Sequence, residues 1–345
     1  MAYLRPLLLA LSLLTATQVL AQAQTLRVLT WPGYADADVV AAFEKRYKVT
    51  VEVTLVGSDE ALRSKIGENQ GGNFDVIAAN TAEIHNYVNQ GLLQPLTPGR
   101  ISNTTQQLPR FRDYARIPDI RVNGKLYAIP YVWSDMGLIY DRKQFSTPPD
   151  SINSMWDPKY QDRVLAFNTS NHNFSLASLS LGGDPFQIEP AQFPKVYERL
   201  IALRRNVLTF YSLPEEAAEL FRRHGVALIF ANYGRQQLKQ LRDAGADVGY
   251  VIPREGALAW LDCWAVSRGA RDAGLASQWI NYMLEPQVSG LLSERQGLAD
   301  TLRDPDGASS SSHLIWLRPV EDDRRRAALW QRIVSGERPP LREAP

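Results

Sequence analysis

The sequence has one cysteine, Cys263, so no disulfide can form within a single chain. It also lacks an apolar run long enough to span a membrane, which takes roughly 20 residues, because the run near its start is too short and no later stretch qualifies. Acidic and basic residues nearly balance, at 37 against 38. A balanced surface argues against nucleic acid or an anionic membrane as the main partner. With 345 residues the chain can instead bury a large hydrophobic core without disulfides.

Signatures of catalysis are missing as well. The chain contains no G-x-S-x-G, H-E-x-x-H, P-loop or G-x-G-x-x-G motif. Its four histidines are scattered, without metal-ligand spacing, and no two tyrosines are adjacent as an iron-capturing cluster would favour. The sequence therefore predicts a protein that is not an enzyme and needs no metal or cofactor.

The first residues have the features of a secretory leader. Arg5 precedes an apolar run from Pro6 to Leu14, and Ala21 to Ala23 fits an A-x-A cleavage site. We predict a signal peptide over residues 1–23 and a mature protein in the periplasm. An uncleaved anchor is the alternative, and a lipoprotein is disfavoured because no cysteine follows the leader.

Strand-like and helix-like patterns alternate along the mature chain, which predicts an α/β protein with mostly parallel sheets flanked by helices. The helices expected from apolar spacing and caps include 37–47, 58–66 with Ser58 as N-cap, 81–89, 174–181 starting at Phe174, and 273–284 capped by Asp272. Two long extended segments, residues 126–133 and 259–266, are candidates for crossings between two lobes. Lobes joined in this way enclose a cleft that closes by hinge motion. We assign residues 24–132 with 260–303 to lobe 1 and residues 133–259 with 304–345 to lobe 2.

Two aromatic residues, Trp31 and Tyr34, follow the first predicted strand, at its turn into a helix. In open α/β sheets ligands bind at the carboxyl ends of the strands. Aromatic faces at such a place suit a hydrophobic or cationic ligand.

Several segments resemble, in the same order, motifs of the spermidine/putrescine-binding family, the periplasmic components of ABC importers. They are Leu29-Thr-Trp-Pro-Gly-Tyr34, Phe74-Asp-Val-Ile-Ala-Ala-Asn-Thr81, Tyr127-Ala-Ile-Pro-Tyr-Val-Trp133, Met155-Trp-Asp-Pro-Lys-Tyr160 and Ala259-Trp-Leu-Asp262. The resemblance implies a two-lobed type II periplasmic binding protein with its ligand cleft between the lobes. It also implies a monomer that delivers its ligand to an ABC permease in the inner membrane.

The resemblance further implies an aromatic cage with acidic end-clamps around an amine. Trp31 and Tyr34 would form one wall, Trp260 would stack on the ligand and Asp262 would pair with an ammonium group. Local alternatives remain, because Asn80 and Asp135 could cap a helix and a turn, Phe230 could belong to the core, and Tyr233 could be an ordinary loop aromatic. The expected ligand-binding set is Trp31, Tyr34, Asn80, Asp135, Phe230, Tyr233, Trp260 and Asp262.

Departures from the family pattern leave the ligand open. Gly33 stands where polyamine binders place an acidic residue, and Tyr233 stands where putrescine binders have an aspartate. A dication needs a carboxylate at each end, because burying an unpaired charge is costly, and Asp135 could supply the second one. Besides a putrescine- or spermidine-like polyamine, an ω-amino acid such as 4-aminobutyrate remains, with its carboxylate held by Arg235, Arg254 or hydroxyls. A ligand-presenting sensor subunit is a further alternative to a transport role.

Overall fold

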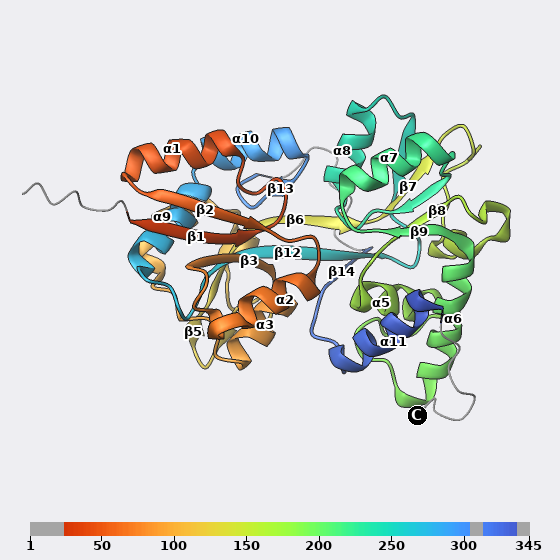
Figure 1. Cartoon of the computed structure of the whole chain (residues 1–345), viewed down its shortest axis with the longest axis horizontal. Helices are drawn as coiled ribbons and strands as arrows, with labels where there is room; N and C mark the ends of the chain where they lie inside the picture. Colours follow the sequence, from red (N-terminus) through yellow and green to blue (C-terminus); the bar gives the residue numbers. More distant parts are fainter. Residues whose placement is uncertain (1–23, 304–312, 337–345) are drawn as a thin grey trace, which may run out of the picture.

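A computed structural model of the protein describes residues 24–303 and 313–336. Two β-sheets form the centres of two lobes (Figure 1). The larger sheet has the strand order β13-β6-β12-β3-β1-β2, with β14 beside β12, and the smaller one has the order β11-β7-β10-β8-β9. The predicted leader lies outside the described residues. Within the described ranges, no helix is long and apolar enough to cross a membrane.

The first part of the larger sheet follows the predicted alternation of strands and helices. Strand β1 pairs in parallel with β2 and with β3, so their carboxyl ends lie at one edge of the sheet. Ser58 caps α2 as predicted, because its side chain accepts a hydrogen bond from the backbone of Ala61. The elements are β1 (Thr25–Thr30), α1 (Ala37–Tyr47), β2 (Thr50–Leu55), α2 (Asp59–Gly67), β3 (Val76–Asn80) and α3 (Thr81–Asn89).

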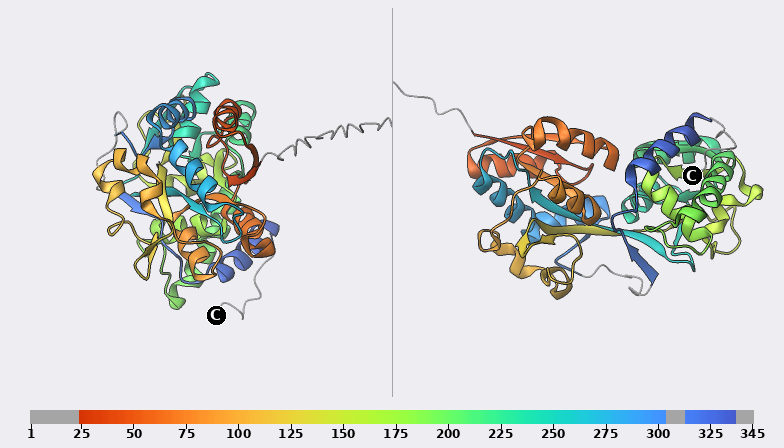
Figure 2. Two further views of the ribbon diagram at one scale, coloured as in Figure 1. Left: turned by 90° about the vertical axis from the view of Figure 1, so that its left-hand side faces the viewer. Right: turned by 90° about the horizontal axis from the view of Figure 1, so that it is seen from below.

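Two long, fully buried strands, β6 (Ala128–Met136) and β12 (Ala257–Val266), connect the lobes. They pair with each other in antiparallel fashion along their length and run from one lobe towards the other (Figure 2). Gly137 follows β6 directly. A larger residue would not fit there, because its Cβ would lie only 2.6 Å from the Val251 carbonyl oxygen. Strand β12 also runs antiparallel to β3 in the larger sheet, and β7 runs antiparallel to β10 and β11 in the smaller one. Both sheets are therefore mixed, and the expected parallel pairing holds only for part of each.

The second lobe is built on the smaller sheet. Helix α5 begins at Ser170, four residues before the predicted start at Phe174, because its first turn is polar and lacks the apolar spacing that marks a helix in the sequence. The elements of this lobe are β7 (Leu138–Asp141), β8 (Val164–Phe167), α5 (Ser170–Ser180), α6 (Phe193–Asn206), β9 (Val207–Tyr211), α7 (Pro214–His224), β10 (Leu228–Phe230), α8 (Arg235–Asp243) and β11 (Val248–Val251).

The C-terminal part of the chain contributes to both lobes. Asp272 caps α9 as predicted, and β14 pairs with β12 before the chain enters α11, which packs against α5 and α6 (Figure 1). Among the described residues, the chain thus passes between the lobes at Gly137, at 252–256 and at 317–322. The predicted lobe boundaries stay a prediction. The remaining elements are α4 (Pro109–Arg112), β4 (Arg121–Val122), β5 (Lys125–Leu126), α9 (Ala273–Met283), α10 (Pro286–Gln296), β13 (Ala299–Asp300), β14 (Leu314–Trp316) and α11 (Asp323–Ser335).

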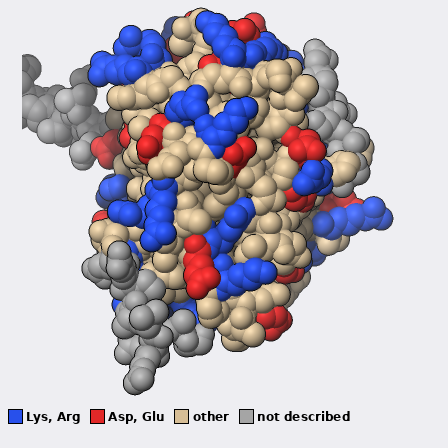
Figure 3. Space-filling model, turned by 90° about the vertical axis from the view of Figure 1, so that its right-hand side faces the viewer, with Lys and Arg blue, Asp and Glu red and all other residues tan. Residues whose placement is uncertain are grey.

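The surface of the second lobe matches the balanced composition. Its outer end carries basic side chains spread among acidic and uncharged ones (Figure 3). The core beneath is continuous across the connecting strands, and the single cysteine, Cys263, is buried within it. This architecture leaves the carboxyl ends of β1 and β3 facing the second lobe across a hollow.

Candidate functional site

A hollow lies between the two lobes. Six of the eight predicted ligand-binding residues line it: Trp31, Tyr34, Asn80, Tyr233, Trp260 and Asp262. The side chains that sequence reasoning left out of the set are Ser58, Asp59, Phe167, His172, Asn232, Gln236 and Leu317. Residues more than two hundred positions apart therefore meet at one place, as expected for a cleft between lobes.

The other two predicted residues lie elsewhere. Asp135 pairs directly with Ala259 across the β6–β12 ladder. Directly opposed residues share a face of a sheet, and neighbours along a strand alternate, so Asp135 faces away from Trp260. Its carboxylate instead accepts a hydrogen bond from the Tyr250 hydroxyl and lies 3.8 Å from the Arg235 guanidinium.

Phe230 is 1% exposed at the end of β10 and is part of the hydrophobic core. It borders a separate small void beside Met136 and Leu138 rather than the hollow. This position fits the alternative stated for Phe230, that its ring belongs to the hydrophobic core and not to the ligand-binding set.

Asp262 is a buried carboxylate beside aromatic rings. The Tyr34 hydroxyl donates a hydrogen bond of 2.7 Å to its Oδ2. Burial raises the pKa of Asp262 to about 7, although the Tyr34 hydrogen bond opposes the rise and the nearby Asp59 adds to it. Within the described part of the chain, no lysine or arginine forms an ion pair with Asp262. The site thus holds a carboxylate that the described residues leave without a cationic partner.

Asp59 is a second buried carboxylate in the same hollow, and sequence reasoning missed it. It is the first residue of α2, and its Oδ1 accepts a 3.1 Å hydrogen bond from the Asn80 side chain. Burial raises its pKa to about 6. An aspartate in the first turn of a helix is ordinary, because it complements the helix dipole. The one available signal was its position after β2, near the ligand-binding edge of the sheet.

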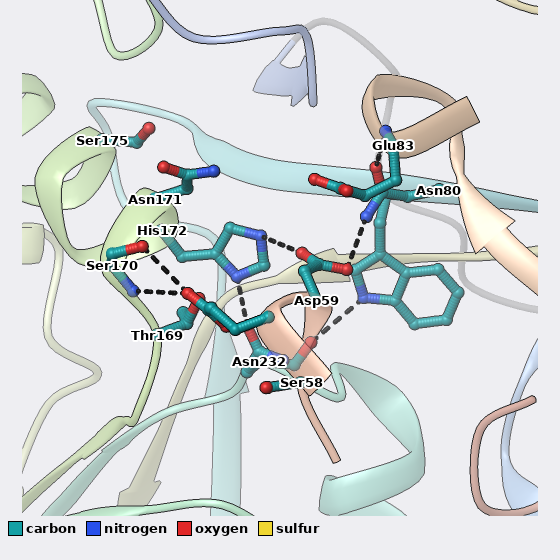
Figure 4. A network of polar contacts seen from close by, with 12 residues as sticks. Ser58, Asp59, Asn80, Glu83, Thr169, Ser170, Asn171, His172, Ser175 and Asn232 are labelled. Atoms are coloured by element: carbon teal, nitrogen blue, oxygen red, sulfur yellow. Dashed lines mark hydrogen bonds and ion pairs between the residues drawn. The ribbon is translucent and has the colours of Figure 1, made fainter. Parts of the chain in front are cut away.

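A polar network with members from both lobes lies beside the hollow (Figure 4). His172 Nδ1 lies 2.7 Å from Asn232 Oδ1, and its Nε2 lies 3.8 Å from Asp59 Oδ2. The indole N–H of Trp260 donates to the Asn232 backbone carbonyl at 3.0 Å. Burial lowers the pKa of His172, which favours the neutral imidazole. These contacts fix the Trp260 ring against the cavity.

Hydrogen bonds also join the lobes across the hollow. Glu60, on α2 of the first lobe, accepts hydrogen bonds from the backbone N–H and hydroxyl of Ser170, at 3.2 and 2.9 Å. Thr169, the N-cap residue of α5, makes no cap with its own side chain, so Glu60 caps that helix from the other lobe. Tyr233 and Gln236 reach the Gly57 and Pro32 carbonyls, both at 3.4 Å. In this structure the two lobes therefore contact each other on both sides of the hollow's lining.

Comparison with known proteins gives a consistent result. The profile described as "Bacterial extracellular solute-binding protein" matches residues 38–299. The spermidine/putrescine-binding periplasmic protein 1 of Haemophilus influenzae is 26% identical over 276 residues, covering 78% of this chain and 73% of that protein. The putrescine-binding periplasmic protein PotF of Escherichia coli is 24% identical, covering 95% and 96%. The TpPotD lipoprotein of Treponema pallidum shares the fold, with a TM-score of 0.75 at 16% identity, covering 90% and 99%.

Proposed function

Since this chain belongs to the bacterial extracellular solute-binding protein family, we propose that it captures a polyamine or related amine and delivers it to an ABC permease. The observation that carries the proposal is Asp262, a buried carboxylate without a cationic partner in the described structure, set beside Tyr34 and Trp260. The names of the relatives from Haemophilus influenzae and Escherichia coli support the same ligand class.

An ammonium group suits this site for two physical reasons. Its pairing with a desolvated carboxylate through a charge-assisted hydrogen bond contributes roughly 1.5–3 kcal/mol. Its contact with the face of an aromatic ring contributes about 0.5–2 kcal/mol. Trp31 and Trp260 line the hollow and can supply such faces. The same pairing removes the cost of keeping the Asp262 charge buried alone.

Lobe closure couples binding to delivery. Ligand in the hollow contacts side chains of both lobes, so it stabilises the closed arrangement that the Glu60–Ser170 contact also favours. The permease would then recognise the closed form. We further propose that residues 1–23 are a cleaved leader, that the mature protein is a periplasmic monomer, and that it releases its ligand unchanged.

A thermal-shift panel on ligand-stripped mature protein tests this function. We expect putrescine, spermidine or agmatine to raise the melting temperature, since a ligand at about 100 times its Kd adds roughly 2.7 kcal/mol of stability. Neutral amino acids without a side-chain amine should leave the melting temperature unchanged. If no amine in the panel shifts it, the proposed ligand class is wrong.

Amine binding should release protons near neutral pH. The pKa values of Asp262 and Asp59 are raised to about 7 and about 6, and a bound cation lowers both. Affinity should therefore fall as the pH drops below about 7, because the carboxylates must first lose their protons. Titration calorimetry at about pH 6.5 in buffers of different ionisation enthalpy measures the protons released. Equal enthalpies in all buffers would contradict the assignment of these carboxylates to the site.

A further inference from the structure

We propose that Asp59 is the second anchoring carboxylate, and that the ligand is therefore an aliphatic diamine with a free ammonium group at each end rather than an ω-amino acid. The inference rests on the proposed amine-binding function and adds to it the residue that recognises the second nitrogen. Asp59 is not part of the set that the family motifs suggest.

The position of Asp59 satisfies what a second clamp requires. Asn80 lies directly opposite Asp262 in the β3–β12 ladder, and the Asn80 amide donates to Asp59. The two carboxylates thus flank one short polar side chain and open into the same hollow. Both are more than nine-tenths buried, at 8% and 6% exposed.

Among the described residues, no lysine or arginine forms an ion pair with Asp59, although the charge of the nearby Arg63 acts on it. The Arg63 guanidinium, on the same helix, donates to Glu83 at 2.8 Å. His172 Nε2 lies 3.8 Å from Asp59, but burial lowers the pKa of that imidazole. Burial raises the pKa of Asp59 even though the Arg63 charge lowers it, so Arg63 offsets only part of the cost of burying this carboxylate. A second ammonium group on the ligand would offset more of this cost.

A ligand carboxylate would meet only neutral donors, such as the Ser58 hydroxyl and the Gln236 amide, in the described lining of the hollow. None of the side chains that line it in the described residues is a lysine or an arginine. Arg254 pairs with Asp150 at the surface, and Arg235 lies over the Tyr250 ring near Asp135. The N-terminus of α5, which would attract an anion, is already occupied by Glu60. A zwitterion would therefore bring its carboxylate against acidic groups.

Calorimetry with three ligands of similar length tests the inference: putrescine, n-butylamine and 4-aminobutyrate. The wild-type protein should bind putrescine and prefer it to 4-aminobutyrate by at least about 100-fold, a difference near 2.7 kcal/mol. Asp59→Asn should weaken putrescine binding by at least about 30-fold while changing n-butylamine binding by less than about threefold. Asp38→Asn, at an exposed aspartate in the first turn of α1, is the matched control and should change neither.

The outcomes distinguish a failure of the diamine inference from a failure of the proposed amine-binding function. If Asp59→Asn binds putrescine within about threefold of wild type, or if the wild-type protein prefers 4-aminobutyrate, the diamine inference is overturned and amine binding stands. If the wild-type protein binds none of the three compounds nor any longer polyamine, the proposed function itself fails. The wild-type preference is measured without any variant, so a poorly folded Asp59→Asn protein still leaves the inference testable.

Discussion

Replacing Asp262 with asparagine is expected to remove amine binding and, in the same molecule, to stabilise the ligand-free protein. Binding should weaken by at least about 100-fold, or roughly 2.7 kcal/mol, because the ligand ammonium would be desolvated without its counter-charge. Asparagine keeps the size of the side chain and can still accept the Tyr34 hydrogen bond. The loss therefore reports charge rather than packing.

The gain in stability follows from the raised pKa of Asp262, which burial brings from 3.8 to about 7. The folded state holds this proton more tightly than the unfolded state, so the free energy of unfolding falls as pH rises between those two values. Asparagine does not titrate. At about pH 8 the variant should be more stable by roughly 2–4 kcal/mol, and near pH 4 the difference should disappear.

Thermal melts at both pH values and calorimetry with putrescine measure the two effects together. Asp135→Asn is the matched control, since it makes the same change in β6 at a carboxylate outside the hollow, and it should leave the affinity close to wild type. An Asp262→Asn protein that binds amines normally would remove Asp262 from the site. A variant less stable than wild type at about pH 8 would show that the buried charge is compensated.

Replacing Arg326 with methionine should cause a large loss of stability in the second lobe. Arg326 is a fully buried arginine on α11, and its guanidinium binds both carboxylate oxygens of Glu321, at 2.8 and 2.6 Å. It also donates to the Asn171 and Pro185 carbonyls and to the Ser175 hydroxyl. Methionine fills part of the space but leaves these acceptors unsatisfied. Breaking a buried ion pair from one side costs about 3–5 kcal/mol.

The measurement is the melting temperature, which should fall by roughly 6–15 °C. Arg324→Met is the matched control, because Arg324 is an exposed residue of the same helix, and it should change the melting temperature little. Double replacement of Arg326 and Glu321 by apolar residues should recover part of the loss, as both charges of this pair, one buried and one half-buried, are then removed. Equal melting temperatures for the two single variants would show that the Arg326 network contributes little.

The sequence determined the main helices and strands of residues 25–89. Apolar spacing and caps predicted α1, α2 and α3, because helix periodicity and Ser58 or Asn80 at an N-cap are local properties. It also indicated the edge of the sheet that borders the hollow. Trp31 and Tyr34 follow β1 directly, and the carboxyl end of a parallel strand has the same role in every open α/β sheet.

Strand pairing decided which of the predicted residues meet. Asp135 and Asp262 both lie in long extended segments. Their neighbours in the sequence do not show which of the two carboxylates faces the hollow. The β6–β12 register places Asp135 opposite Ala259, and alternation along the strand turns it away from Trp260. A shift of one residue would have exchanged the faces.

Contacts between distant segments decided the rest. Asp59 and Glu60 look like ordinary charges in the first turn of a helix, and Arg326 like the polar side of an amphipathic one. Asp59 faces the hollow, Glu60 caps α5 in the other lobe and Arg326 is buried against α5. The physical reason is that local patterns depend on neighbours within a few residues, whereas burial and charge compensation depend on groups brought together only when the two lobes assemble.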